Sequence, residues 1–174
     1  YFLVDYGPMV TEDSGSSWRF LNLPAIQGVN NRKTASGGAI DPNNSNTINT
    51  AIGYWNPNKY ILIRTTNGGN NTGDWSTVHS AISEKFNFVD FHPQNSNYVY
   101  AGYATTGLIS KDNGQTWEVI PGNKAIRAVY KKNGDIIYAL ETPTSGSSIL
   151  WRSNDKGLTW TSLGTNPFRG AEEI

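Results

Sequence analysis

Cysteine is absent from this chain of 174 residues, and histidine occurs only twice, at His79 and His92. Disulfide bonds, thiolate catalysis and cysteine-ligated zinc or iron–sulfur centres are therefore excluded. The two histidines lie far apart without the spacing of metal ligands, so neither a metal nor a cofactor is expected. His92 precedes Pro93, which favours a position in an exposed turn.

Long apolar runs and an excess of one charge are also missing. The 14 Lys and Arg residues balance 14 Asp and Glu residues, so the formal net charge is zero. Such a chain has no basic surface for nucleic acid, and no segment is apolar enough to insert into a membrane. Charged residues make up only 16% of the sequence, whereas Gly, Asn, Ser and Thr abound. This composition is typical of a turn-rich β protein.

One pattern of eight residues, Ser/Thr-x-Asp-x-Gly-x-Ser/Thr-Trp, recurs along the chain. Three copies occupy 11–18, 110–117 and 153–160, and a degraded fourth begins at Thr65 and carries three extra residues before its Trp. Positions 13, 67, 112 and 155 correspond and are 54, 45 and 43 residues apart. A propeller blade of four strands takes about 40–50 residues. We call these segments octets; their defining residues are Asp13, Gly15, Trp18, Asn67, Gly69, Trp75, Asp112, Gly114, Trp117, Asp155, Gly157 and Trp160.

Each octet has the chemistry of a hairpin turn. The Asp carboxylate can accept hydrogen bonds from nearby backbone N–H groups, and the Gly can adopt a positive φ. The Trp then opens the next strand and offers a large apolar ring to the blade. We therefore interpret the octet carboxylates as structural rather than catalytic.

A second repeated element precedes the octets and completes the blades. Residues 39–46, 90–97 and 128–135 each read as a short apolar strand, a turn and the start of a second strand. The chain is therefore predicted to be all-β, a single β-propeller segment over 1–174 built of four-stranded antiparallel blades. We expect a partial blade at 1–22, blades at about 37–79, 87–120 and 125–163, and the first strand of a further blade at 168–174. These about four blades form either a small closed ring or, as we favour, part of a larger ring of six to eight blades.

The octets, together with the Asp-Pro-x-Asn turn at Asp41, resemble those of the Asp-box (BNR-repeat) propeller family over the whole chain. They look most like secreted bacterial BNR-repeat proteins and xyloglucanase-like propellers. That resemblance implies an extracellular or cell-surface location. The family's enzymatic motifs are missing here: Phe168-Arg169-Gly170 lacks the Ile-Pro of sialidases, and the stretches 101–107 and 139–142 lack the catalytic Asp of xyloglucanases.

Ligands usually meet a propeller on the face opposite the octets, near its central channel. The candidate ligand-binding residues there are Tyr54, Trp55, Asn56, Tyr103 and Arg32. Tyr54 or Trp55 could instead pack between blades. Asp5 and Glu141 are weak catalytic candidates, because a hydrolytic pair must converge within roughly 5–10 Å.

The leading hypothesis is a non-catalytic binding or scaffold propeller that recognises a glycan or protein partner on the channel face. Other blades or chains could complete its ring. The alternative is a part of a xyloglucanase-like glycoside hydrolase acting on a β-glucan polysaccharide, with its catalytic carboxylates outside this segment. A sortilin-like peptide receptor is weaker, since such receptors usually carry a cysteine-rich module.

Overall fold

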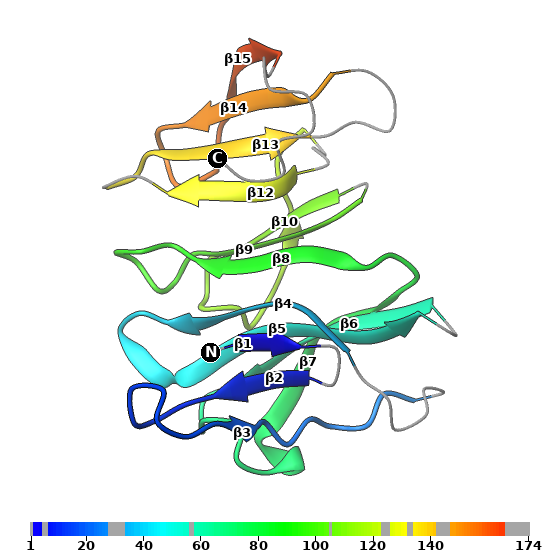
Figure 1. Cartoon of the computed structure of the whole chain (residues 1–174). Coiled ribbons are helices and arrows are strands. Elements are labelled where there is room, and N and C mark those ends of the chain that lie inside the picture. Colours follow the sequence, from blue (N-terminus) through cyan, green and yellow to red (C-terminus); the bar gives the residue numbers. More distant parts are fainter. Residues whose placement is uncertain are drawn as a thin grey trace.

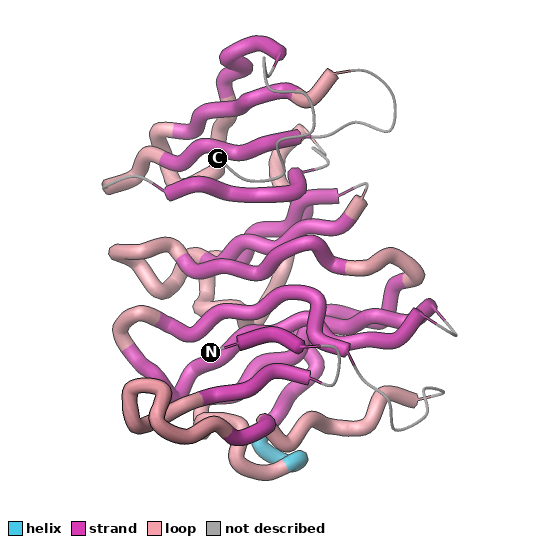
Figure 2. Tube along the Cα trace, in the orientation of Figure 1, coloured by secondary structure: helices cyan, strands magenta, loops and turns pink. Residues whose placement is uncertain are grey.

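The computed structural model of this protein shows an all-β chain (Figures 1 and 2). Its strands form four antiparallel sheets, joined by turns and a single 3₁₀ turn, η1 (Thr72–Asp74), in the described part of the chain. The described residues are 2–4, 7–27, 34–55, 58–104, 106–122, 126–131, 134–141 and 147–165.

Each sheet is a meander in which a strand pairs with the one before it. The first sheet holds β1 (Phe2–Val4), β2 (Gly7–Val10) and β3 (Arg19–Phe20). The second holds β4 (Thr34–Asp41), β5 (Asn44–Trp55), β6 (Asn58–Thr65) and β7 (Trp75–Ile82). The third holds β8 (Phe86–Phe91), β9 (Val99–Tyr103), β10 (Thr106–Ser110) and β11 (Glu118–Val119). The fourth holds β12 (Ile126–Lys131), β13 (Ile137–Glu141), β14 (Ile149–Ser153) and β15 (Thr161–Thr165).

The inner strands are apolar on both faces because each middle sheet is covered on both sides. Ile48 and Ile52 of β5 face the first sheet, whereas Ala51 of the same strand packs with the third. Side chains alternate between the two faces of a strand. A continuous apolar run in the sequence therefore becomes two buried faces, as expected for a sheet inside a stack.

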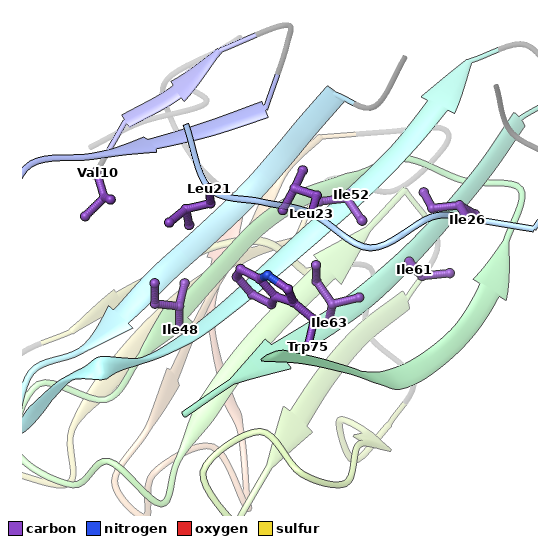
Figure 3. Packing of buried hydrophobic residues seen from close by; sticks show 9 residues of the cluster. All are labelled: Val10, Leu21, Leu23, Ile26, Ile48, Ile52, Ile61, Ile63 and Trp75. Carbon is purple, nitrogen blue, oxygen red and sulfur yellow. The ribbon is translucent and has the colours of Figure 1, made fainter. Parts of the chain in front are cut away.

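Three apolar clusters join neighbouring sheets. Figure 3 shows the first, in which Leu21 and Leu23 meet Ile52, Ile63 and the ring of Trp75. The second and third clusters fill the corresponding spaces between the second and third sheets and between the third and fourth. Complete burial of one such side chain contributes about 1.5–3 kcal/mol, so the clusters hold the stack together.

The four sheets lie in a row in which contacts lead from each sheet to the next. Strands β1 and β2 pack on β4, β4 and β5 pack on β8, and β8 to β10 pack on β12. The first and fourth sheets lie at opposite ends of this row (Figure 1). The described residues therefore form a row of stacked blades. The strand predicted at 168–174 lies outside them.

His92 differs from its expected place in an exposed turn. Its side chain is only 1% exposed, and its Nδ1 accepts a hydrogen bond from the Gln94 backbone at 3.2 Å. The turn that contains it folds against the fourth sheet, since the Gln94 side chain accepts a hydrogen bond from the Gly134 backbone at 2.7 Å. Packing between sheets thus buries a residue that the local sequence places at the surface.

Candidate functional site

The three well-matched octets lie along one edge of the stack, where the third strand of a sheet turns into the fourth. They share one set of hydrogen bonds. In the third sheet, the Asp112 carboxylate accepts from the Thr116 backbone at 2.8 Å, from the Thr116 hydroxyl at 2.5 Å and from Ser110 at 2.8 Å. The Ser110 hydroxyl in turn accepts from the Gly114 backbone at 2.8 Å. The octets of the first and fourth sheets repeat these contacts around Asp13 and Asp155. Each carboxylate is thus occupied in its own turn.

The hydrogen bonds lower the pKa of the octet carboxyls. For Asp13, those from the Ser17 hydroxyl and backbone and from Thr11 lower the pKa to about 2. For Asp112, burial raises the pKa, but hydrogen bonds from Thr116 and Ser110 outweigh it and lower the pKa below its ordinary value. The same balance lowers the pKa of Asp155. These groups are therefore ionised at neutral pH and poor proton donors.

The degraded octet uses another acid. Asn67 takes the Asp position, and its side chain donates to the Asp74 carboxylate at 3.2 Å. Asp74 also accepts from the Asn71 backbone at 2.7 Å, which closes η1. The Trp75 indole donates to the carbonyl of Asn22, just after β3 of the first sheet, at 2.9 Å. This octet keeps its Trp in the joint between sheets although three residues have been added to the turn.

The fourth residue of an octet has a left-handed backbone and reaches the preceding sheet. Asn113, with φ 62°, donates to the Asp41 carboxylate at 2.8 Å, and its side-chain oxygen accepts from Arg64 at 2.7 Å. Its backbone carbonyl accepts from Arg64 Nε at 2.8 Å and from the Asn49 amide at 3.4 Å. We call this contact set the octet joint between the second and third sheets.

In that joint the Asp41 carboxylate is held away from water, and the Arg64 side chain is half-buried. Burial raises the pKa of the Asp41 carboxyl, but hydrogen bonds from Ser96, Asn43 and Asn113 outweigh it and lower the pKa. Burial lowers the pKa of Arg64, and the negative charges of Asp112 and Asp41 oppose that shift. Asp41 is only 5% exposed, so both charges depend on these partners.

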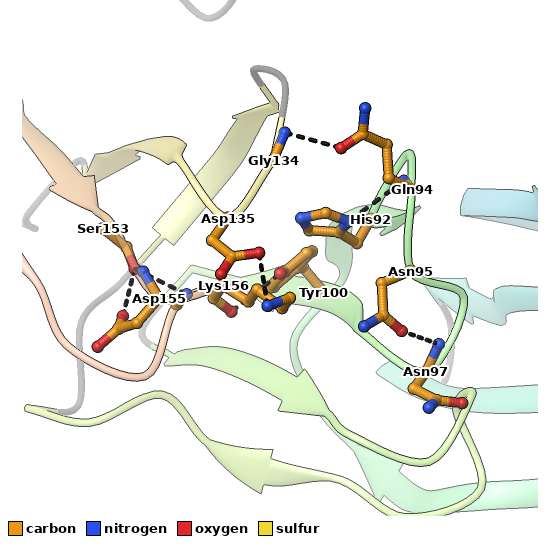
Figure 4. Close-up of polar contacts among 11 residues, drawn as sticks. His92, Gln94, Asn95, Asn97, Tyr100, Gly134, Asp135, Ser153, Asp155 and Lys156 are labelled. Atoms are coloured by element: carbon orange, nitrogen blue, oxygen red, sulfur yellow. Dashed lines mark hydrogen bonds and ion pairs between the residues drawn. The ribbon is translucent and has the colours of Figure 1, made fainter.

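A second octet joint connects the third and fourth sheets (Figure 4). Lys156, with φ 58°, takes the place of Asn113, and its carbonyl accepts from the Tyr100 hydroxyl at 2.9 Å. The Lys156 ammonium pairs with Asp135 at 2.5 Å and lies 5.7 Å from the centre of the Tyr98 ring. Burial raises the pKa of Tyr100, so its hydroxyl stays protonated and can donate. The two joints thus use different donor side chains, but in each the acceptor is the backbone carbonyl of the fourth octet residue.

Along the edge of the stack opposite the octets, the described part of the β5–β6 hairpin is longer than the described parts of the β9–β10 and β13–β14 hairpins. Among the described residues its ladder has eight residue pairs, whereas the β9–β10 and β13–β14 ladders have five each. Three further pairs correspond to a projection of about 10 Å at roughly 3.3 Å per residue. Trp55 pairs with Asn58 in the last step, and Tyr54, which is half-buried, pairs with Lys59 in the step before. The hairpin therefore carries two predicted ligand-binding residues at its end.

The hairpin is tied to the first sheet's side of the stack. The Lys59 ammonium donates a hydrogen bond to the carbonyl of Gln27. Asn56, the third predicted residue of this tip, lies outside the described residues, as do Arg32 and Asp5. Their predicted roles remain predictions.

Two other candidates on this end have packing partners. The Tyr103 ring meets Phe86 edge-on, with ring centres 5.4 Å apart and planes at 83°. The Glu141 carboxylate accepts a hydrogen bond from the Trp151 indole at 2.7 Å. The roles of both residues in binding or catalysis also remain predictions.

A cavity of about 420 Å³ lies at the octet end, between the first two sheets. Val10, Ile40 and Ile48 contribute apolar lining, and the Glu12–Arg19 ion pair, 2.6 Å long, stands beside them. Of the candidates whose side chains the structure describes, Tyr54, Tyr103 and Glu141 are not part of its lining. No group of three potential metal ligands occurs among the described residues, and no helix there is long and apolar enough to cross a membrane.

Solved structures show which known proteins share this architecture. The chain is similar to the GH74 enzyme of Niastella koreensis, with a TM-score of 0.65 and 21% identity over 94% of this chain and 27% of that one. An ancestral GH74 enzyme gives a TM-score of 0.66 and 20% identity, with 92% of this chain and 23% of that one covered. YCF48 bound to a D1 peptide gives 0.51 and 19%, with coverages of 82% and 45%.

These similarities confirm the predicted fold class. The chain is a run of β-propeller blades and spans about a quarter of the length of the two GH74 enzymes. At these identities the likeness concerns the fold. No protein-family model matches the sequence, and no curated protein does.

Proposed function

We propose that this chain is a non-catalytic binding or scaffold part of a secreted or cell-surface propeller, and that it holds a glycan or protein partner on its channel face. The observation that carries the proposal is the projecting β5–β6 hairpin, which ends at Tyr54 and Trp55. Aromatic side chains at a hairpin tip can stack on a sugar ring or cover an apolar side chain of a peptide.

The occupation of the carboxylates argues for binding without catalysis. A glycoside hydrolase needs two carboxyl groups across the scissile bond, one of them with a raised pKa so that it can donate a proton. Here the octet carboxyls and Asp41 have lowered pKa values and are held by hydrogen bonds. Glu141 accepts from the Trp151 indole. Each of these groups has a structural task in the described blades.

The test combines binding with turnover on one probe. Xyloglucan oligosaccharides are titrated into the chain by calorimetry, and newly formed reducing ends are measured in the same samples. We expect binding without new reducing ends, and loss of binding in Trp55→Ala. Phe20→Ala is the matched control, because Phe20 is 51% exposed and lies on β3, away from the hairpin tip. Release of reducing ends by the chain would overturn the non-catalytic proposal.

Similarity to the two GH74 enzymes favours a second candidate, a segment of a β-glucan hydrolase whose catalytic carboxylates lie outside the described blades. A protein partner is the other form of the leading proposal, and a propeller of related fold, YCF48, was solved with a bound peptide. Binding of a peptide that Trp55→Ala abolishes, with no binding of the oligosaccharides, would identify the partner as protein.

A further inference from the structure

Asparagine followed by glycine occurs three times in this chain, at 67–68, 113–114 and 133–134. Asparagine is among the chemically least durable side chains. A glycine after it leaves its own backbone nitrogen open to approach, because glycine has no Cβ. Asn133 lies outside the described residues. The other two pairs both lie in octets, so the fold decides which of them is protected.

Deamidation requires the asparagine side chain and the next backbone nitrogen to come together. The glycine nitrogen attacks the side-chain carbonyl carbon, Cγ, and a cyclic succinimide forms. The bond from Cγ to the amide nitrogen breaks, and ammonia leaves with the proton of the attacking nitrogen. Water then opens the ring at either carbonyl and gives aspartate or isoaspartate. Only water is consumed, so hydrogen bonds that hold the two groups elsewhere set the rate.

The octet joint holds Asn113 away from this reaction. Its side chain donates to the Asp41 carboxylate at 2.8 Å and to the Ser96 carbonyl at 2.9 Å. Its oxygen accepts from Arg64 at 2.7 Å. The nitrogen of the glycine that follows is buried and donates to the Ser110 hydroxyl at 2.8 Å. All four hydrogen bonds must open before the ring can form.

Asn67 is held less firmly. Its side chain is exposed and makes one hydrogen bond among the described residues, a donation to Asp74 at 3.2 Å. The attacking nitrogen, that of Gly68, donates to the Asn46 carbonyl at 2.9 Å. Only these two bonds have to open, and they lie in an exposed turn. Local opening costs less free energy where few contacts are shielded from water.

We propose that Asn67 is a site of spontaneous deamidation in the folded protein, and that the reaction weakens the degraded octet. The product carries a carboxylate where the amide stood, beside the Asp74 carboxylate that the amide now binds. A hydrogen-bond donor is thus replaced by a like charge. Asp74 also closes η1, so the turn before Trp75 loses one of its contacts. This site is independent of the proposed ligand of the channel face.

Peptide mapping by mass spectrometry tests the site on the whole chain. Native protein is kept for several days in mildly alkaline buffer, and the conversion of each asparagine is followed. Asn67 should convert faster than Asn113 by about tenfold or more, because fewer bonds must open. In guanidinium chloride, where neither turn is folded, the two should convert at similar rates.

Arg64→Met removes a hydrogen bond from the Asn113 side chain. It should accelerate conversion of Asn113 and leave that of Asn67 unchanged. Equal rates for the two asparagines in the native wild-type chain would overturn the proposal. So would an Asn67 that stays intact in the native chain while it is converted in guanidinium chloride.

The product itself can be made as Asn67→Asp. At neutral pH this variant should melt about 2–4 °C below wild type, and the difference should shrink at high salt, which screens the two carboxylates. Asn97→Asp is the matched control, because it adds the same charge at another exposed position, and it should melt like wild type. Equal melting temperatures for the two variants would show that conversion does not weaken the turn.

Discussion

The contribution of the octet joint between the second and third sheets to the free energy of unfolding can be measured with Asn113→Gly. Glycine tolerates the left-handed backbone, with φ 62° in Asn113, so the turn itself loses nothing sterically. The substitution does remove the hydrogen bonds of the Asn113 side chain to Asp41 at 2.8 Å, to Arg64 at 2.7 Å and to the Ser96 carbonyl at 2.9 Å. Hydrogen bonds to charged groups are worth about 1.5–3 kcal/mol each.

The expected loss lies near the lower end of that sum. Arg64 is half-buried, so water can replace part of what it loses, and we expect the free energy of unfolding to fall by about 3 kcal/mol. Ser14→Gly is the matched control. Ser14 has the same left-handed backbone, with φ 58°, in an exposed turn without a joint among the described residues. Glycine relieves the strain of a positive φ in the folded state but also gives the unfolded chain more conformational freedom. These two effects on stability should nearly cancel.

Urea unfolding followed by tryptophan fluorescence and by circular dichroism measures both variants. Two probes are needed because stacked repeats can lose two-state behaviour. If Asn113→Gly and Ser14→Gly change the unfolding free energy by the same amount within about 0.5 kcal/mol, the joint contributes nothing and the reasoning fails.

Two further results are expected. Gly114→Ala should lower the melting temperature more than Gly15→Ala, because both have a positive φ but only the added Cβ at 114 collides with the Asn49 side chain; equal losses would exclude the collision. The pKa of Asp13 lies at about 2, below its ordinary 3.8, so its contribution to stability is complete above about pH 4 and disappears as the pH falls toward 2. The difference in urea midpoint between wild type and Asp13→Asn should therefore shrink over that range, and a constant difference would contradict the assignment.

The blades could be predicted from the sequence because the residues that indicate them are close together along the chain. An octet contains its own acceptor, its own left-handed residues and its own Trp, so the turn between the third and fourth strands of a sheet can be read from eight letters. The strand alternation on either side follows from the same window.

The octet joints could not be predicted from the sequence, because the residues that form them lie far apart along the chain. Asp41 and Asn113 meet only after two sheets have stacked, and neither sequence neighbourhood indicates the other. One signal was present: Arg64 ends the apolar run Tyr60–Ile63, where a charge needs a partner. The burial of His92 has the same cause. The length of the β5–β6 hairpin is not evident from the sequence either, since polar and aromatic residues near a turn fit a loop as well as a strand end.

The degraded octet also shows what these turns will tolerate. Its three additional residues are absorbed by η1, while Trp75 remains 8% exposed and bonded to Asn22. Such a turn therefore has to place one indole ring at a fixed position, whereas the number of residues before that ring can vary. Turns of this kind are natural points for grafting: a peptide epitope or label inserted between Gly69 and Trp75 would lengthen an excursion that the fold already accommodates.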